Sequence, residues 1–397
     1  MPGDIPIEFV LFGLTLLGVA VLHRHSLAVA LTGLAAILIF KFASGAFTMS
    51  DAVTHFAHEW VVLANLFLLL LGFAVLARHF ERSAIADALP PLLPKDWKGG
   101  FALLAVVFVL SAFLDNIAAA IIGGTIASTV FKGRVHIGFL AAIVAAANGG
   151  GSGSVIGDTT TTMMWIEGVS PLLVLHAYIA AGVAFVVFAI PAAMAQQRHA
   201  PIIRDSHARV SIDWTSVYIV VFILVAAVAV NVLVNLRMPE RADQWPFLGL
   251  AVWGAILFAT PLRRPDWHVV PHAAGGAVFL LSLVACASLM PVESLPDPTW
   301  SSTLLLGFVS SLFDNIPLTK LALDQGGYDW GFLAYAVGFG GSMTWFGSSA
   351  GVAIATRFPQ ARSVVAWLRH GWYVALAYVV GYFAFLAVLG WNVSGSP

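Results

Sequence analysis

The chain has 397 residues, of which 60 % are hydrophobic and only 10 % are charged, whereas a water-soluble domain carries about 25 % charged residues. This composition excludes a soluble globular protein and places the chain in a lipid bilayer. The 19 basic and 20 acidic residues almost cancel, without a basic tract, and Cys286 is the single cysteine, so nucleic acid as a partner and a cysteine-ligated metal centre are also excluded. A transporter, a channel or an intramembrane enzyme remains.

Apolar segments long enough to cross a bilayer recur along the whole chain. A helix needs about 20 apolar residues to cross the hydrocarbon core. The first segment carries acids but no Lys or Arg before it and no cleavage pattern after it, so we expect a membrane helix rather than a signal peptide. The predicted spans lie near residues 5–22, 26–42, 60–77, 136–166, 172–195, 214–236, 245–260, 273–290, 331–356 and 372–391.

Two further apolar segments, residues 99–131 and 299–323, are each interrupted at mid-length by the dipeptide Asp-Asn. The dipeptides are Asp115-Asn116 and Asp314-Asn315. Each limb of the first segment is too short for a full crossing. We therefore predict two re-entrant hairpins whose tips stop inside the membrane.

The basic residues of the loops indicate the orientation of the chain. With the N-terminus outside, most of the basic residues fall in the inner loops, as the positive-inside rule requires. Lys98 and Lys132 then flank the first hairpin inside, whereas acidic residues flank the second hairpin outside. We expect hairpins that enter from opposite faces of a cell inner (cytoplasmic) membrane, with both termini outside, in the periplasm.

The two halves of the chain share motifs in the same order. The segment 111–117 (SAFLDNI) matches 310–316 (SSLFDNI), and 150–157 (GGSGSVIG) matches 340–347 (GGSMTWFG). Two such matches beside hairpins of opposite entry predict an inverted-topology repeat. The predicted organisation is a first repeat at 1–195 with hairpin 99–131 and broken helix 136–166, a cytoplasmic linker at 196–213, and a second repeat at 214–397 with hairpin 299–323 and broken helix 331–356.

Glycine clusters lie in the middle of the segments 136–166 and 331–356. Clustered glycine unwinds a helix, and unwound backbone at membrane depth is tolerated only where protein covers it or where it lines a wet cavity. The predicted fold class is therefore an all-α polytopic membrane protein, in which two broken helices face two hairpin tips.

Three aspartates, Asp115, Asp158 and Asp314, fall at these tips and breaks. A carboxylate near the bilayer centre costs about 3 kcal/mol or more, so each needs a compensating role. One role is a cation and proton site, with the aspartates as sodium ligands and with Asn116 and Asn315 beside them. The alternative is that each aspartate only caps a helix N-terminus.

Hydroxyl and amide side chains surround the three aspartates in the sequence. Such groups are hard oxygen donors and suit sodium or lithium, whereas a clamp for a dicarboxylate would need an Arg, which this core lacks. Lys320, the one basic residue inside a hairpin, is expected to snorkel outward. The residues predicted to line the site are Asn148, Ser152, Ser154, Thr159, Thr160, Ser342, Thr344, Ser348 and Ser349.

The run 148–166 (NGGGSGSVIGDTTTTMMWI), together with Asp-Asn-Ile in both halves and the run 340–351 (GGSMTWFGSSAG), resembles NhaD-type sodium/proton antiporters. These belong to the ion-transporter superfamily with the arsenite and citrate permeases. The resemblance implies a scaffold domain, a mobile transport domain, a homodimer, and ions bound between hairpin tips and broken helices. This chain departs from the family at 149–155, where the family carries Ala-Gly-Gly-Ala-Trp-Ser-Pro.

We therefore expect a secondary active transporter that exchanges sodium or lithium for protons by alternating access, as both ions compete for the same carboxylates. The alternative is cation-coupled transport of a small anion such as citrate or a dicarboxylate, or of an oxyanion such as arsenite. We expect no enzyme, because a zinc-binding pattern and an activated nucleophile are both missing, and no cofactor beyond the transported Na⁺ and H⁺. The expected partners are the bilayer, these ions and a second copy of the chain.

Overall fold

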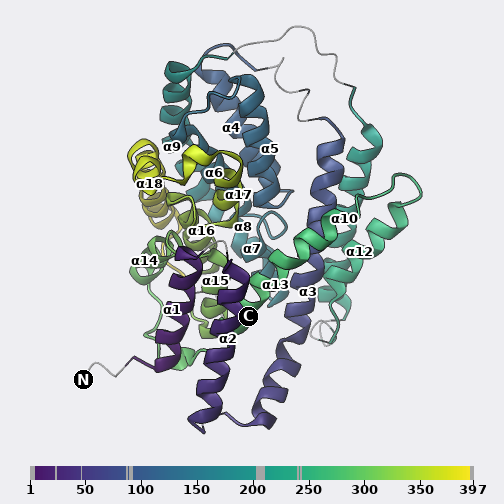
Figure 1. Cartoon of the computed structure of the whole chain (residues 1–397), viewed down its shortest axis with the longest axis vertical. Helices are drawn as coiled ribbons and strands as arrows, with labels where there is room; N and C mark the ends of the chain where they lie inside the picture. The colour runs from purple at the N-terminus through teal and green to yellow at the C-terminus, as the bar shows by residue number, and fades with distance from the viewer. Residues whose placement is uncertain are drawn as a thin grey trace. The chain divides into compact units, whose positions relative to one another are not determined.

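The computed structural model describes residues 5–22, 25–45, 47–85, 88, 93–202, 211–238, 241 and 244–393, without the side chains of 231, 235 and 236. In these ranges the secondary structure is helical, with no β-strand (Figure 1). Part of the predicted linker, residues 203–210, lies outside them. Six helical segments are long and apolar enough to cross a membrane: Ser26–Ala43, Met49–Arg82, Pro171–His199, Trp214–Val234, Val269–Ser288 and Val364–Leu389. The structure confirms the predicted all-α polytopic class.

The chain folds into two compact units, and each unit draws on both halves of the sequence. Unit 1 comprises Met1–Phe80, Trp214–Pro296 and Ile316–Gln325, and unit 2 comprises Glu81–Asp213, Asp297–Asn315 and Gly326–Pro397. This division does not test the predicted repeat boundaries, which stay predictions.

Unit 1 contains a long helix, α3, and two hydrogen bonds connect it to α12. Asn65 of α3 accepts a hydrogen bond from the Gly249 amide at 3.0 Å, and the Trp253 indole donates to the Leu68 carbonyl at 2.8 Å. α1 packs on α2, α2 on α13, and α10 on α12. The helices of unit 1 are α1 (Ile7–Val21), α2 (Ser26–Ala43), α3 (Met49–Arg82), α10 (Trp214–Arg237), α12 (Phe247–Ala259), α13 (Val269–Ser288), η3 (Val292–Ser294) and α15 (Asn315–Gln325).

The sequence underestimates α3, because the predicted span covers only residues 60–77 of its 34 residues. At 1.5 Å per residue the helix is about 50 Å long, well beyond a hydrocarbon core of about 30 Å. Its first turns carry Asp51, His55 and Glu59 and therefore do not register as apolar. They are helical all the same.

Lys320 of α15 does not snorkel outward, and that prediction is wrong. The residue is 1 % exposed, and its Nζ lies 3.0 Å from the carboxylate of Glu59 and 2.8 Å from that of Asp324. Glu59 lies 261 positions away in the chain, so no local sequence pattern shows that its carboxylate contacts the Lys320 ammonium group.

Unit 2 is built around two helices, α6 and α16, that are buried on every side. Each residue from Gly138 to Gly151 and from Trp330 to Gly340 is buried, as expected for helices that are apolar all round. α4, α5, α9 and α18 pack against α6. The helices of unit 2 are α4 (Trp97–Ser111), α5 (Asn116–Val130), α6 (Ile137–Gly151), α7 (Thr159–Ile166), α8 (Pro171–Leu175), α9 (Ala177–His199), α14 (Trp300–Ser310), α16 (Trp330–Gly340), η4 (Gly341–Met343), α17 (Ser349–Arg357), η5 (Pro359–Arg362) and α18 (Val364–Leu389).

Both hairpin segments are interrupted where Asp-Asn occurs. α4 ends at Ser111 and α5 begins at Asn116, and the two helices pack on each other. Each has 15 residues and is about 22 Å long, shorter than a bilayer core of about 30 Å. α14 and α15 are separated in the same way, by residues 311–314. The depth of these tips in a membrane stays a prediction.

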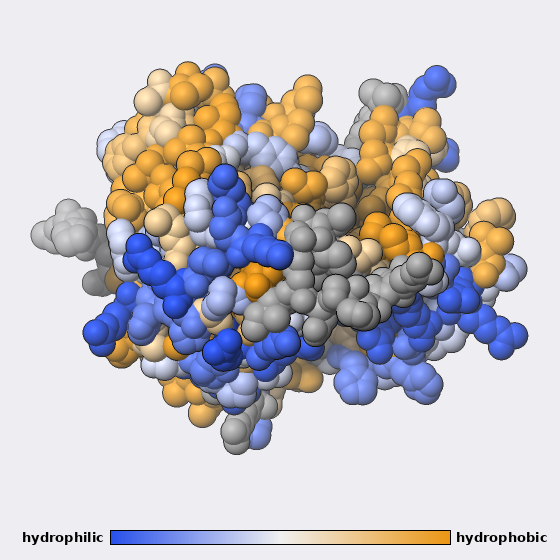
Figure 2. Space-filling model, turned by 90° about the horizontal axis from the view of Figure 1, so that it is seen from above, coloured by the Kyte–Doolittle hydropathy of each residue, from blue (hydrophilic) through white to orange (hydrophobic). Residues whose placement is uncertain are grey.

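The described surface is rich in exposed hydrophobic side chains. Phe258 is 75 % exposed and Val365 is 77 % exposed, in helices of unit 1 and unit 2 respectively. Figure 2 shows that hydrophilic and hydrophobic residues gather in separate areas of the surface that it draws. Apolar surface of this extent requires an apolar solvent, which for this protein is the lipid bilayer.

Candidate functional site

In unit 2 the hairpin limbs contact the broken helices through hydrogen bonds that recur in both halves of the chain. The Ser111 hydroxyl donates to the Ala147 carbonyl at 2.5 Å, and the Ser310 hydroxyl donates to the Val337 carbonyl at 2.8 Å. These four residues are related by the offsets of the two sequence matches, 199 and 190. The matching motifs therefore make matching contacts.

A second pair of contacts follows the same offsets at the turns themselves. The Ser154 hydroxyl donates to the Ala112 carbonyl at 2.6 Å, and the Thr344 hydroxyl donates to the Ser311 carbonyl at 2.5 Å. Ser154 and Thr344 thus connect each break to its hairpin through a main-chain carbonyl, and the oxygen of each hydroxyl keeps acceptor lone pairs.

Glycine allows the two backbones to meet. A Cβ at Gly150 would clash with the Phe108 carbonyl oxygen, and a Cβ at Gly340 would clash with that of Gly307. These pairs also follow the offsets of the repeat. α6 and α16 therefore approach the hairpins as closely as main chain permits, and each helix ends there.

Asn148, on the last turn of α6, connects residues from both halves of the sequence. Its Oδ1 accepts from the Asn116 amide at 3.1 Å, and its Nδ2 donates to the hydroxyls of Ser342 and Ser348, each at 3.0 Å. Asn148 is fully buried. Four residues predicted to belong to the site thus form one network.

Asp158 joins this network as the N-cap of α7. Its Oδ1 accepts from the Asn116 amide at 3.2 Å, and its Oδ2 accepts from the Thr160 hydroxyl at 2.9 Å. The carboxylate is 2 % exposed. A Cβ at Gly338 of α16 would lie 3.3 Å from Oδ2, so this glycine, which the sequence analysis missed, lets α16 reach the carboxylate.

Asp115 and Asp314 lie at the hairpin tips and are half-buried. Asp115 caps α5 by accepting from the Ile117 amide at 3.2 Å, and Asp314 accepts from the Ser349 hydroxyl at 3.0 Å. A carboxylate has about four acceptor sites, so a carboxylate that caps a helix can also bind an ion. Capping and ion binding are therefore compatible roles.

The remaining predicted residues are placed differently. The Ser152 hydroxyl donates to the Gly149 carbonyl at 2.9 Å, within its own turn. Thr159 and Asn315 are the first residues of α7 and α15. The side-chain network comprises Asn116, Asn148, Asp158, Thr160, Ser342 and Ser348, and Asp314 contacts Ser349.

The two halves differ where the network is most polar. At the offset of 190, Asn148 corresponds to Gly338 and Asp158 corresponds to Ser348. At these positions the first half therefore has the amide of Asn148 and the carboxylate of Asp158. The second half has Gly338, which carries no side chain, and the hydroxyl of Ser348. Extending the second sequence match two residues toward the N-terminus would have paired Asn148 with Gly338.

The side chains of the site present mainly oxygen atoms of carboxylate, amide and hydroxyl groups. Helix N-termini attract anions through their unpaired N–H groups. Here a carboxylate accepts from one such group at α5 and from one at α7, and the Ser348 hydroxyl accepts from the Gly351 amide at α17. The side chains of the network and of the Asp314–Ser349 pair include no Lys, Arg or His. Carboxylate, amide and hydroxyl oxygens are the donors that hard cations prefer.

Comparisons with known proteins bear on the class of transporter. A family model described as citrate transporter matches residues 9–340, which is most of the chain. The Na(+)/H(+) antiporter NhaD of Halomonas elongata is 31 % identical over 133 residues, which are 30 % of this chain and 26 % of that protein. The matched region therefore spans about a quarter of the length of this relative.

Proposed function

The chain belongs to the citrate transporter family and is a multi-pass membrane transporter, and on this premise we propose that it exchanges Na⁺ or Li⁺ for protons. The observation that carries the proposal is the placement of carboxylates at the N-termini of α5 and α7 in unit 2, where each accepts from a first-turn N–H group. The carboxylates of Asp115 and Asp158 lie at helix N-termini, where an anionic substrate would otherwise bind.

Exchange follows from competition for the same oxygen atoms. Asp115, Asp158 and Asp314 carry three formal negative charges in apolar surroundings, which is costly without a compensating cation. A sodium ion and a proton compensate the same charge, so one leaves when the other binds. If the site opens to one side of the membrane at a time, this competition couples the two gradients.

The relative NhaD is by its name a sodium/proton antiporter, and it is similar to this chain over a limited region. Our proposal extends that activity to this chain. It also includes a homodimer in a cell inner membrane, with both chain termini outside.

Proton flux in proteoliposomes tests the proposal. Purified protein is reconstituted with a pH-sensitive dye inside, and NaCl or LiCl is added outside over a range of alkaline pH, without any organic or oxyanion substrate. We expect Na⁺ and Li⁺ to drive proton movement and K⁺ to drive less. A matched Asp158→Asn protein should be silent, because the amide binds no proton. Its oxygen can still accept from Asn116, and its NH₂ group can donate to the Thr160 hydroxyl, so the shape of the site is kept.

The description of the family favours a second candidate, cation-coupled transport of citrate or a related small anion. In that case a cation at the same carboxylates would first neutralise the site, and the anion would bind beside it. Silence with Na⁺ and Li⁺ alone, combined with sodium- or proton-dependent accumulation of labelled citrate or arsenite, would replace the antiporter by this carrier.

A further inference from the structure

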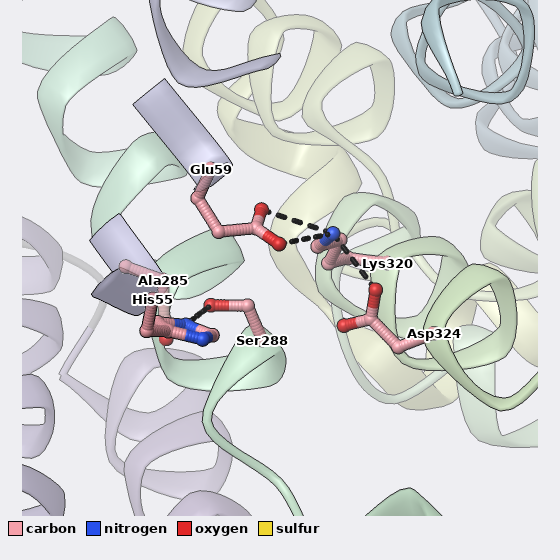
Figure 3. Close-up of polar contacts among 6 residues, drawn as sticks. All are labelled: His55, Glu59, Ala285, Ser288, Lys320 and Asp324. Carbon is pink, nitrogen blue, oxygen red and sulfur yellow. Dashed lines mark hydrogen bonds and ion pairs between the residues drawn. The ribbon is translucent and has the colours of Figure 1, made fainter. Parts of the chain in front are cut away.

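Two groups of titratable side chains lie outside the candidate site. In unit 1 the Lys320 ammonium contacts two carboxylates, so opposite charges meet there (Figure 3). In unit 2 three histidine rings lie together: the His136 ring is 5.4 Å from that of His199 and 5.2 Å from that of His370. Protonated imidazole is positive, so the histidine group requires negative charge from a neighbour or from a ligand.

A cavity of about 460 Å³ lies beside the three histidines. Arg134 and Gln360 line it together with the histidines. The lining comes from four segments of unit 2: the residues before α6, the end of α9, η5 and α18. None of its described lining residues is an Asp or a Glu. We call this cavity the histidine pocket, and its volume is within the range of about 300–1,000 Å³ that is usual for small-molecule sites.

The charged residues that adjoin this lining in the sequence are all basic. They are Lys132 before α6, Arg198 in α9, Arg362 in η5 and Arg369 in α18, and each is exposed. In the part of the chain that the structure describes, the Arg134 guanidinium has no ion-pair partner. A guanidinium stays charged at every physiological pH, so the histidine pocket is positive even when its histidines are neutral.

Hydrogen bonds determine where two of the rings carry a proton. Nδ1 of His136 accepts from the Gly138 amide at 3.2 Å, so the neutral ring carries its proton on Nε2. Nδ1 of His370 lies 2.9 Å from the Ala366 carbonyl oxygen, which can only accept, so Nδ1 carries the proton in this ring. Uptake of a second proton on Nε2 of His370 therefore adds a donor and keeps the contact with Ala366.

The three histidines oppose one another's protonation. Burial, and then the charges of His370 and His199, lower the pKa of His136. An anion in the histidine pocket would compensate these positive charges and favour the protonated rings. Binding of an anion and binding of protons therefore support each other, as linked equilibria require.

We propose that the histidine pocket binds a phosphate group, which belongs either to an anionic phospholipid or to a soluble phosphate compound. Donors that come from four segments approach a ligand from several directions, and this suits the tetrahedral oxygens of phosphate better than a planar carboxylate. The positive-inside rule predicts that the pocket lies on the cytoplasmic side, where basic pockets between membrane helices bind lipid headgroups. This binding does not depend on the proposed sodium/proton exchange.

Native mass spectrometry of the whole protein in neutral detergent tests the lipid source. Phosphatidylglycerol is titrated against zwitterionic phosphatidylcholine, and we expect one phosphatidylglycerol per chain to be retained in preference. Arg134→Gln should weaken this binding about tenfold, because it removes a charge-assisted contact at an exposed position where folding does not depend on it. Arg357→Gln, an exposed residue of α17 outside the lining, is the matched control and should bind as the unmodified protein does.

Equilibrium dialysis with radiolabelled inorganic phosphate tests the soluble source on the same three proteins. We expect a similar loss of about tenfold in Arg134→Gln and no loss in Arg357→Gln. Unlabelled phosphate should displace the label. If citrate displaces it equally well at the same concentration, the assignment to phosphate is wrong.

The contribution of the histidines is read from the effect of pH on phosphatidylglycerol binding, since the charge of this phosphodiester does not change between pH 6 and pH 8. The unmodified protein should bind more tightly at pH 6, where imidazolium donors are present. His370→Gln, whose side-chain amide can still donate to the Ala366 carbonyl, should show a smaller difference. An equal difference in both proteins would exclude His370 from the site.

The two probes distinguish the sources of the phosphate group. Binding that Arg134→Gln weakens for phosphatidylglycerol alone assigns the pocket to lipid, and binding that it weakens for inorganic phosphate alone assigns it to a soluble compound. If neither probe binds the unmodified protein more tightly than it binds Arg134→Gln, the proposal is wrong. All these measurements are made without sodium-driven transport, so they stand whether or not the protein exchanges sodium for protons.

Discussion

Single residues distinguish the two halves of the site. Asp158 and Ser348 each cap the helix that follows a break, through Thr160 and Gly351 respectively. They correspond to each other at the sequence offset of 190, yet only Asp158 can carry a charge or a proton. Asp115 and Asp314, by contrast, are carboxylates in both halves. The charge of the site is therefore set at three positions, and substitution of these positions is the most direct test.

Asp314→Asn should abolish exchange while the protein stays folded. The amide retains an oxygen that accepts from the Ser349 hydroxyl, now at 3.0 Å from the carboxylate, but it binds neither a proton nor a sodium ion strongly. We expect the rate to fall about 100-fold or more, the usual minimum for loss of a proton-transfer group. Dye-reported flux and the melting temperature in detergent measure the two properties. Asp297→Asn, at an exposed position, is the control. Wild-type flux from Asp314→Asn would show that Asp314 has a structural role and does not bind the transported ions.

His136 should make the stability of unit 2 depend on pH. The residue precedes α6, its Nδ1 accepts from the Gly138 amide at 3.2 Å, and its ring lies 5.4 Å from that of His199 and 5.2 Å from that of His370. Burial, and then the neighbouring charges of His370 and His199, lower the pKa of His136 below 6.5. The unfolded chain therefore binds a proton at higher pH than the folded chain does.

The sign of the pH effect follows from this lowered pKa. The stabilisation is complete above about pH 6.5 and is lost as the pH falls through the lower pKa of the folded state. His136→Asn keeps an N-cap residue and removes the titration. Melting temperatures across this range should fall less on acidification in His136→Asn than in the unmodified protein, whereas His272→Asn, at an exposed position, should behave as unmodified. Equal acid sensitivity of His136→Asn and the unmodified protein would contradict the assignment.

At the scale of elements, α6 and α16 end where they meet a hairpin. Gly150 and Gly340 bring the main chain of each broken helix against a carbonyl of α4 or α14. The polar ends of the helices are then satisfied by hairpin residues and by hydroxyls of the breaks. Packing and helix termination are thus parts of one arrangement.

Gly150→Ala should destabilise unit 2 and reduce transport. Its Cβ would meet the backbone of Phe108, which cannot rotate away as a side chain does. Overpacking of this kind costs about 1–3 kcal/mol. Gly182→Ala is the matched control, since a Cβ there meets nothing within 4 Å and alanine favours a helix. Thermal unfolding in detergent should show a lower melting temperature for Gly150→Ala only, and equal values for both variants would contradict the close approach.

At the scale of the whole molecule, each compact unit combines segments from both halves of the chain. The inverted-topology repeat itself stays a prediction. Membrane orientation then decides whether the two hairpins enter from opposite faces.

Cysteine labelling tests this topology in intact cells. In a Cys286→Ala background, Lys98→Cys and Arg134→Cys flank the first hairpin and are both exposed, and we expect a membrane-impermeant maleimide to miss both. Asp297→Cys, before the second hairpin, should react. If 98 and 134 react from opposite faces, the first hairpin crosses the membrane, and the site built on its tip is wrong.

The sequence by itself determined the helical membrane class, the interruptions at Asp115 and Asp314, and the candidate carboxylates. These features depend on composition and on residues close together in the chain: apolar runs are helical in a bilayer, glycine clusters interrupt helices, and Asp-Asn begins them. The same local reasoning missed the first turns of α3, because their polar residues lower the hydropathy from which membrane helices are predicted.

Only the tertiary structure decided which polar groups meet. Asn148 binds Ser342 and Ser348 across 194 and 200 positions, and Lys320 binds Glu59 across 261. The sequence alone does not show these contacts, because a buried amide or ammonium group is tolerated wherever the fold brings a partner to it. The sequence therefore specified the charged and polar residues of these contacts, and the packing of distant helices decided which of them became partners.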